Sequence, residues 1–362
     1  MKLPPYAKAV ADKLKVNFPA DDLTPDVMAS IKSNLDDLVA EKRATSLSVQ
    51  KKGYRHRYRI PLTEKDALIV EIVHNDPNRS EWRMTWEYNP ARLRKKADRE
   101  NLRVLAKEVL GTDSQRLLGN VSLYALDVAV DFEVELADVA IESRDKSVSG
   151  CWGKTIQARG RLQTLYFGSS ASEHHQSVYD KRDDILAALA RKPGTRLSQI
   201  KAEADGLPSR LRLEDRQRLS RCPVPLHRLA DLREPFKGFH IYSFADAETG
   251  LSDETGRLVL ALAKAEGMQR ALKLLDKSSL AAVRGALAAS QVEWWDAGVY
   301  RTAVRQVVLA TGLFPKAAFD LAERIDTPVE ARYQLRKQRA TQRGAKADPF
   351  ADLDEEDEDA DE

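Results

Sequence analysis

The chain has 362 residues, of which 43% are hydrophobic and 31% charged, so its composition is that of a globular protein and excludes overall disorder. No run approaches the roughly 18 apolar residues of a membrane span, and the first sixteen residues lack the apolar stretch of a secretory signal. The two cysteines, Cys151 and Cys222, form no CxxC pair, which argues against a disulfide framework or structural zinc. We expect a cytoplasmic protein with no membrane partner.

The net charge of +2 conceals an uneven distribution. Residues 352–362, DLDEEDEDADE, hold nine acids and no base, so residues 1–351 carry a net charge of +11. A basic body with a short acidic tail suits a polyanionic partner, because each neutralised phosphate releases counterions. A basic surface that contacts only solvent would give the same distribution of charge.

Residues 1–45 are predicted to be an N-terminal helical segment, with Thr24 as a cap and Pro25 at the first helical position. Alternating and β-branched runs then predict strands, and a basic helix should end at Gly111. The expected strands in this part are 46–52, 54–62, 67–75 and 82–90.

The second half of the chain changes character at about Leu251, where alanine and leucine recur at helical spacing. We predict an α+β protein with an antiparallel-sheet catalytic core, flanking helices and a smaller helical domain. The strands expected before the change are 124–133, 164–169, 177–181 and 209–218, with a last one near Phe239. The predicted units are 1–45 (helical), 46–245 (catalytic and DNA-binding), 251–330 (helical) and 331–362 (a basic, then acidic, disordered tail).

The run YALDVAVDFE, residues 124–133, places an apolar set on one face and carboxylates on the other. Asp131 and Glu133 lie about 7 Å apart along a strand and could converge on a hard cation such as Mg²⁺ or Mn²⁺. Asp127 lies about 13 Å from Asp131, too far to share one ion. A solvent-facing acidic strand would show the same pattern.

The run SVYDK, residues 177–181, places Tyr179 and Lys181 on one face of an extended chain. A strand tyrosine is commonly a core residue with a wet hydroxyl, but Lys181 could lower its pKa or hold a phosphate. In SRLRLEDRQR, Glu214 lies between Arg212 and Arg216, either paired with them or as a metal ligand beside a phosphate clamp.

The run KKGYRHRYR, residues 51–59, has five bases, two tyrosines and no acid. Its alternation sends Arg55, Arg57 and Arg59 to one face. A basic ribbon with aromatic residues fits DNA backbone contacts and base stacking, although a solvated hairpin would have the same sequence.

The segment GCWGKT, residues 150–155, has the end of a phosphate-binding loop, but Val148 stands where its first glycine is required. We therefore reject a nucleotide-hydrolysing function. The six histidines include no pair at i, i+2 or i, i+4, so a histidine-based metal site is not expected.

In LDVAVDFE, LYFGS, SVYDK, RLRLE and WRMTWEYNPARL, the sequence resembles the replication initiation factor (Rep_trans) family, the rolling-circle initiators of plasmids and filamentous phages. The similarity spans about residues 38–244. The resemblance implies that Tyr179 is the nucleophile, forming a 5′-phosphotyrosine link and freeing a 3′-OH. It also implies that Asp131, Glu133 and Glu214, with Asp127 as a further acid, hold a divalent metal, Mg²⁺ or Mn²⁺.

This resemblance predicts a metal-dependent DNA nicking-joining endonuclease that starts rolling-circle replication. A conjugative relaxase of the same chemistry and a non-catalytic DNA-binding regulatory protein are the alternatives. Origin DNA, single-stranded or supercoiled, is the expected partner, with a second copy of the chain and a host helicase as further candidates. Tyr166 is the only local substitute for Tyr179 that we consider.

Overall fold

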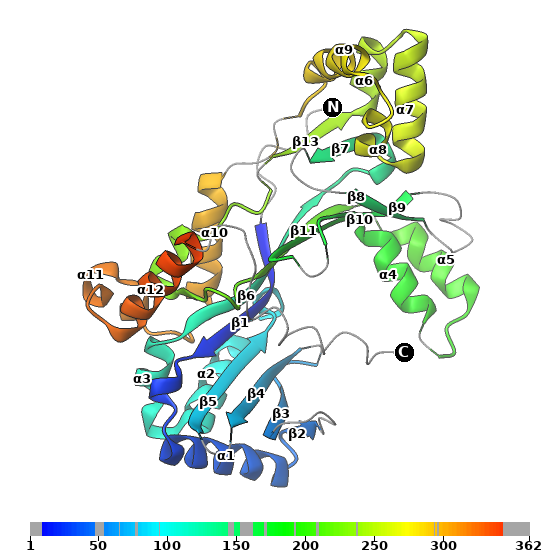
Figure 1. Cartoon of the computed structure of the whole chain (residues 1–362). Coiled ribbons are helices and arrows are strands. Elements are labelled where there is room, and N and C mark those ends of the chain that lie inside the picture. The colour runs from blue at the N-terminus through cyan, green and yellow to red at the C-terminus, as the bar shows by residue number, and fades with distance from the viewer. Residues whose placement is uncertain are drawn as a thin grey trace.

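The computed structural model describes residues 9–342 apart from 48–53, 65, 77–78, 94, 144–147, 153–161, 170–171, 192, 208–209, 237, 293 and 295–296. It confirms the α+β class: a large antiparallel sheet with helices around it (Figure 1). The strands are β1 (Ala9–Phe18), β2 (Thr45–Leu47), β3 (Tyr54–Pro61), β4 (Ala67–Asp76), β5 (Arg79–Tyr88), β6 (Ser122–Phe132), β7 (Val139–Ser143), β8 (Val148–Trp152), β9 (Leu162–Phe167), β10 (His174–Asp180), β11 (Leu211–Arg218), β12 (Val224–Pro225) and β13 (Phe239–Ser243).

Helices occupy most of the remaining described chain, and a 3-10 segment, η5 (Leu226–Asp231), joins β12 to the later part. The α-helices are α1 (Pro25–Ala40), α2 (Lys96–Leu110), α3 (Ser114–Gly119), α4 (Lys181–Ala190), α5 (Leu197–Gly206), α6 (Phe244–Gly250), α7 (Glu254–Glu266), α8 (Met268–Leu272), α9 (Lys277–Ala288), α10 (Ala297–Ala310), α11 (Leu321–Arg324) and α12 (Pro328–Gln342).

The main sheet has the strand order β2-β3-β4-β5-β1-β6-β11-β10-β9-β8, with β12 pairing to β6 at its side. All of its recorded pairs are antiparallel. Strands β7 and β13 pair with each other in a separate two-stranded sheet. The sheet therefore brings β6, β11 and β10, from distant parts of the sequence, side by side.

One face of the main sheet is buried under helices, because its strands alternate apolar and polar residues. The apolar stripe of α1, including Ile31 and Leu35, packs in the same hydrophobic cluster as Val70 and Trp86 of β4 and β5. Figure 1 shows α1 beside the β3–β5 end of the sheet and α10 beside its middle. The opposite face keeps most of the charged residues of the strands, although Asp215 of β11 is fully buried on the apolar face.

Residues 9–18 form a central strand, so the prediction of a helical segment over 1–45 is wrong there. β1 is hydrogen-bonded to β5 on one side and β6 on the other. A bulge between Ala11 and Lys13 interrupts its alternation, and pairing on both sides stabilises the strand against its local preference. The helix predicted from Thr24 is confirmed as α1, and the Thr24 hydroxyl accepts a hydrogen bond from the Val27 amide.

Most of the helices from α6 onward pack in one of two hydrophobic clusters. Helices α6–α9 pack with β7 and β13 in a small cluster of their own, seen in yellow at the top of Figure 1. Tyr300 and Val304 of α10 and Tyr333 of α12 belong to the core of the main sheet. The prediction of a disordered tail from residue 331 is wrong as far as Gln342, where α12 ends; the rest of that tail lies outside the described residues.

None of the described helices has the length and apolar character needed to cross a membrane.

Candidate functional site

Two rows of cross-strand neighbours run over the polar face of the main sheet, two residues apart on β1. Because side chains alternate along each strand, residues paired in register share a face. The first row pairs Arg59 with Ile69, Ile69 with Glu87, and Glu87 with Lys15. The second row pairs Lys13 with Asp127, Asp127 with Arg216, and Arg216 with His175. The structure therefore places the predicted Asp127, Asp131, Arg212, Glu214, Arg216 and Tyr179 on one face of three adjacent strands, β6, β11 and β10.

Tyr179 and Glu214 meet at the centre of this face. The Tyr179 hydroxyl donates a hydrogen bond of 2.9 Å to Oε2 of Glu214, and Nε of Arg216 donates one of 3.2 Å to Oε1. Burial and the nearby Glu214 carboxylate hold the pKa of Tyr179 well above its usual range. The phenol therefore stays protonated at neutral pH and has a carboxylate in contact to take its proton.

Arg212 of β11 lies between a carboxylate of the adjacent strand β6 and one of β1, the next strand beyond it. Its Nε and Nη2 donate to the two oxygens of Asp131 at 2.6 and 2.8 Å, a bidentate pair, and its Nη1 donates to Asp12. Burial raises the pKa of Asp12, an effect that Arg212 opposes. Asp12 is not among the predicted site residues, because the segment 1–45 is predicted to be helical. The alternation in KLKVNF, residues 13–18, is the signal that indicates a strand there.

Asp127 is held on the same face between Lys13 and Arg216 by its cross-strand register. Burial raises its pKa to about 6, although Lys13 opposes the shift. Asp127 and Asp12 also line a cavity of about 360 Å³ whose other walls include Arg59, Asp66 and Arg92. The cavity therefore joins the predicted arginine of β3 to the carboxylates of β1 and β6.

The remaining predicted residues lie at the edges of this face. β10 ends at Asp180, so Lys181 is the first residue of α4, yet its Nζ lies 5.6 Å from the centre of the Tyr179 ring and 2.7 Å from Asp184. Tyr166 of β9 stacks on His175, with ring centres 5.6 Å apart. Glu133 follows the last residue of β6 and is exposed, so it does not continue the strand face.

Two of the three predicted DNA-binding arginines of β3, Arg57 and Arg59, occupy alternate positions on the polar face. Arg57 pairs in register with Glu71 and Arg59 with Ile69, and both side chains are exposed. Arg55 holds the next alternate position of the strand. The basic ribbon thus lies at one end of the face that carries Tyr179.

The carboxylates were predicted to bind a divalent cation, and their oxygen atoms are of the type that Mg²⁺ and Mn²⁺ prefer. Both carboxylate oxygens of Asp131 instead accept hydrogen bonds from Arg212, and those of Glu214 accept hydrogen bonds from Tyr179 and Arg216. Over the described ranges, no three His, Cys, Asp or Glu side chains group so that they could hold a metal. In this arrangement the residues do not fit a metal site, and we derive no chemical step through a cation.

The fold and site define an α+β protein with a tyrosine–carboxylate pair flanked by arginines on a polar sheet face. Comparison with protein-family models and with curated proteins finds no match to this chain.

Proposed function

We propose that the chain nicks and rejoins DNA through a covalent bond to Tyr179, as a rolling-circle replication initiator. The observation that supports this most is the hydrogen bond from the Tyr179 hydroxyl to Glu214, with Arg216 bound to the same carboxylate. A tyrosine that only filled the core would need neither a buried carboxylate nor an arginine at its hydroxyl.

In the proposed reaction, Glu214 accepts the phenolic proton as the Tyr179 oxygen attacks a phosphorus atom of the DNA backbone. The bond from phosphorus to the 3′ oxygen breaks, the leaving oxygen takes a proton, and the 5′ phosphate remains on Tyr179. The guanidinium groups of Arg216 and Arg212 place positive charge where the phosphoryl oxygens gain negative charge. Rejoining is the reverse, with the 3′-OH attacking the phosphotyrosine.

The row of cations on the same face supports DNA as the substrate. Arg57 and Arg59 are exposed on β3, and the side chain of Arg216 is 57% exposed on β11. Phosphate contacts of this kind position a strand without reading its bases. A backbone lying along the charged face from β3 to β10 would reach β10 at His175, four residues before Tyr179 on the same face of the strand.

The cation, Mg²⁺ or Mn²⁺, a homodimer and a host helicase enter the proposal from the family resemblance, and the arrangement of the site adds nothing to them. A cytoplasmic location enters it from the sequence, which shows neither a secretory signal stretch nor a CxxC pair. Nicking in EDTA, compared with nicking in added Mg²⁺ or Mn²⁺, tests the first of these. Activity that is unaffected by the chelator would remove the cation from the proposal.

The second candidate function is a non-catalytic DNA-binding protein. The pairing of Asp131 with Arg212 and of Glu214 with Arg216 favours it, since ion pairs alone can explain why charges lie on the face. Incubation with single-stranded DNA followed by a denaturing gel separates the two functions. A nicking enzyme leaves protein covalently bound to DNA, whereas a binder leaves none.

A further inference from the structure

A second cavity lies at the opposite end of β1 from Asp12. Its volume is about 330 Å³, within the range of small-molecule pockets. Asn17 and Phe18 at the end of β1, Trp82 and Arg83 of β5, and residues of α12 line it. Asp12 and Phe18 are six residues apart on the strand, or about 20 Å, so this cavity is separate from the Tyr179 site.

Positive charge dominates the walls of this cavity. Three arginines, Arg83, Arg332 and Arg336, line it, and Asp21 is the only acid among the lining residues. Arg332 forms an ion pair with Asp21, whose side chain is 73% exposed. Neither Arg83 nor Arg336 forms an ion pair with any described residue. Two guanidinium groups are therefore left to bind an anion from outside.

The cavity also offers groups suited to a planar ring. Trp82, which is half-buried, and Tyr333 both line its wall. An aromatic wall beside two guanidinium groups matches a nucleotide, whose base stacks through its face and whose phosphate takes the positive charge.

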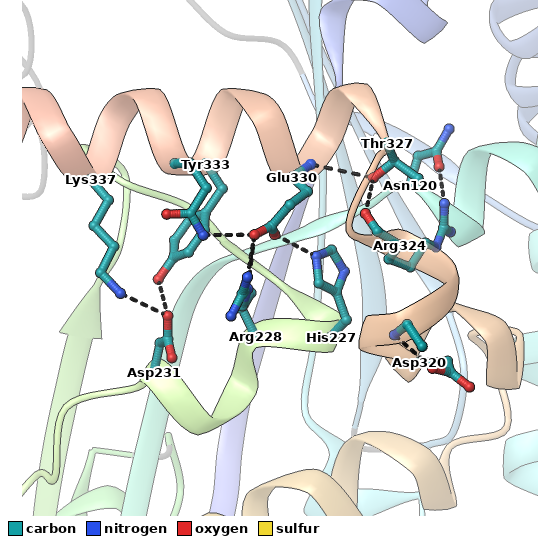
Figure 2. A network of polar contacts seen from close by, with 12 residues as sticks. Asn120, His227, Arg228, Asp231, Asp320, Arg324, Thr327, Glu330, Tyr333 and Lys337 are labelled. Carbon is teal, nitrogen blue, oxygen red and sulfur yellow. Dashed lines mark hydrogen bonds and ion pairs between the residues drawn. The ribbon is translucent and has the colours of Figure 1, made fainter.

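Polar contacts to η5 hold helix α12 in place along one of its faces, as Figure 2 shows. The buried Glu330 carboxylate accepts a hydrogen bond of 3.0 Å from Nε of Arg228 and lies 2.7 Å from Nε2 of His227. One turn further on, the hydroxyl of Tyr333 and Nζ of Lys337 donate to Asp231 at 2.9 and 3.0 Å. These contacts to η5 fix the helix.

The fixed helix presents two like charges to the cavity. Val329, Arg332, Tyr333 and Arg336 recur at i, i+3, i+4 and i+7, so they share one face of α12. Burial and the proximity of Arg336 lower the pKa of Arg332. The two guanidinium groups repel each other, and an anion bound at Arg336 relieves that repulsion.

We propose that this cavity binds a nucleotide, either free or as one unit of a DNA strand. Its phosphate contacts Arg83 and Arg336, and its base lies against Trp82.

Calorimetry with the full chain tests the site, using dATP and inorganic pyrophosphate as probes. Arg83→Ala and Arg336→Ala should each weaken dATP binding about tenfold, the effect of one charge-assisted hydrogen bond. Arg339→Ala is the matched control, because Arg339 is an exposed arginine of α12 that does not line the cavity. Trp82→Leu should weaken dATP about tenfold and leave pyrophosphate unchanged, because pyrophosphate has no base to stack.

A second arm uses a fluorescent 12-nucleotide oligonucleotide with the Tyr179→Phe protein, so that no reaction at the other site contributes. If dATP does not bind but Arg83→Ala and Arg336→Ala weaken oligonucleotide binding more than Arg339→Ala does, the nucleotide comes from a DNA strand. If neither probe distinguishes these variants from the control, the cavity is no nucleotide site. That result would leave the proposed nicking reaction untouched, since no Tyr179 chemistry enters the measurement.

Discussion

The hydroxyl of Tyr179 and the carboxylate of Glu214 are joined by a 2.9 Å hydrogen bond between adjacent strands, although 35 residues separate them in sequence. Their strands pair so that Ser177 lies opposite Glu214 and Tyr179 opposite Arg212. The contact therefore runs diagonally, which a long tyrosine side chain can reach. It makes Glu214 a general base in our account rather than a metal ligand.

Glu214→Gln should lower the rate of nicking about 10²- to 10⁴-fold, the usual contribution of a general base. The amide keeps the shape of the side chain but cannot accept the phenolic proton. Single-turnover nicking of single-stranded DNA measures the rate, and fluorescence anisotropy with the same oligonucleotide is the control for binding. Equal losses of rate and affinity would place Glu214 in DNA binding alone.

Arg212→Ala should destabilise the protein by about 3 kcal/mol, because it leaves Asp12 and Asp131 facing each other without a counterion. Urea unfolding measures the change. Adding Asp131→Asn to the same protein should restore part of the loss, with a coupling energy of about 1–3 kcal/mol. Strictly additive effects of the two substitutions would contradict the pairing.

Asp127 should make the protein less stable as pH rises. Burial raises its pKa from 3.8 to about 6, so the folded state holds the proton more tightly than the unfolded state does. That contribution is present below pH 4 and is lost between about pH 4 and 6. The free energy of unfolding of Asp127→Asn should therefore exceed that of the wild type by about 3 kcal/mol above pH 6 and should equal it at pH 3. Asp138→Asn, at an exposed position, is the control and should show no such dependence.

Glu330 should show the opposite dependence on pH. Burial alone would raise the pKa of Glu330, but hydrogen bonds from Arg228, Gln334 and His227 lower it to about 2. Its contribution is therefore present above pH 4.5 and is lost as pH falls to about 2. Glu330→Gln should cost about 2 kcal/mol at pH 7 and little at pH 2, measured by denaturant unfolding. A constant difference from pH 7 to pH 2 would show that the charge of Glu330 does not anchor α12.

Much of the site could be predicted because alternation along a strand is local. The faces of 124–133 and 209–218 follow from period two alone, and the structure places Asp127, Asp131, Arg212 and Glu214 on one face as expected. Which strands pair is a long-range property, so the contact of Tyr179 with Glu214 and the capture of Asp131 by Arg212 could not be derived. Because of these contacts, the carboxylates of Asp131 and Glu214 are paired with arginine and tyrosine side chains and do not converge on one point.

The wrong predictions for residues 9–18 and 331–342 have physical causes. The bulge at Asp12 interrupts the alternation of β1, so the strand's central position depends on pairing with β5 and β6. The residues of α12 look like a solvated basic segment, but Glu330 and Tyr333 are buried against η5. The ion pairs that hold the helix come from residues about 100 positions earlier in the chain.

Intact-mass analysis of the protein after incubation with single-stranded origin DNA tests the central claim most directly. The wild type should gain the mass of the 5′-phosphorylated fragment, and Tyr166→Phe should behave in the same way. Tyr179→Phe removes one oxygen and keeps the ring, so it should fold and bind DNA but show no added mass. A Tyr179→Phe protein that still carries covalently bound DNA would contradict the account.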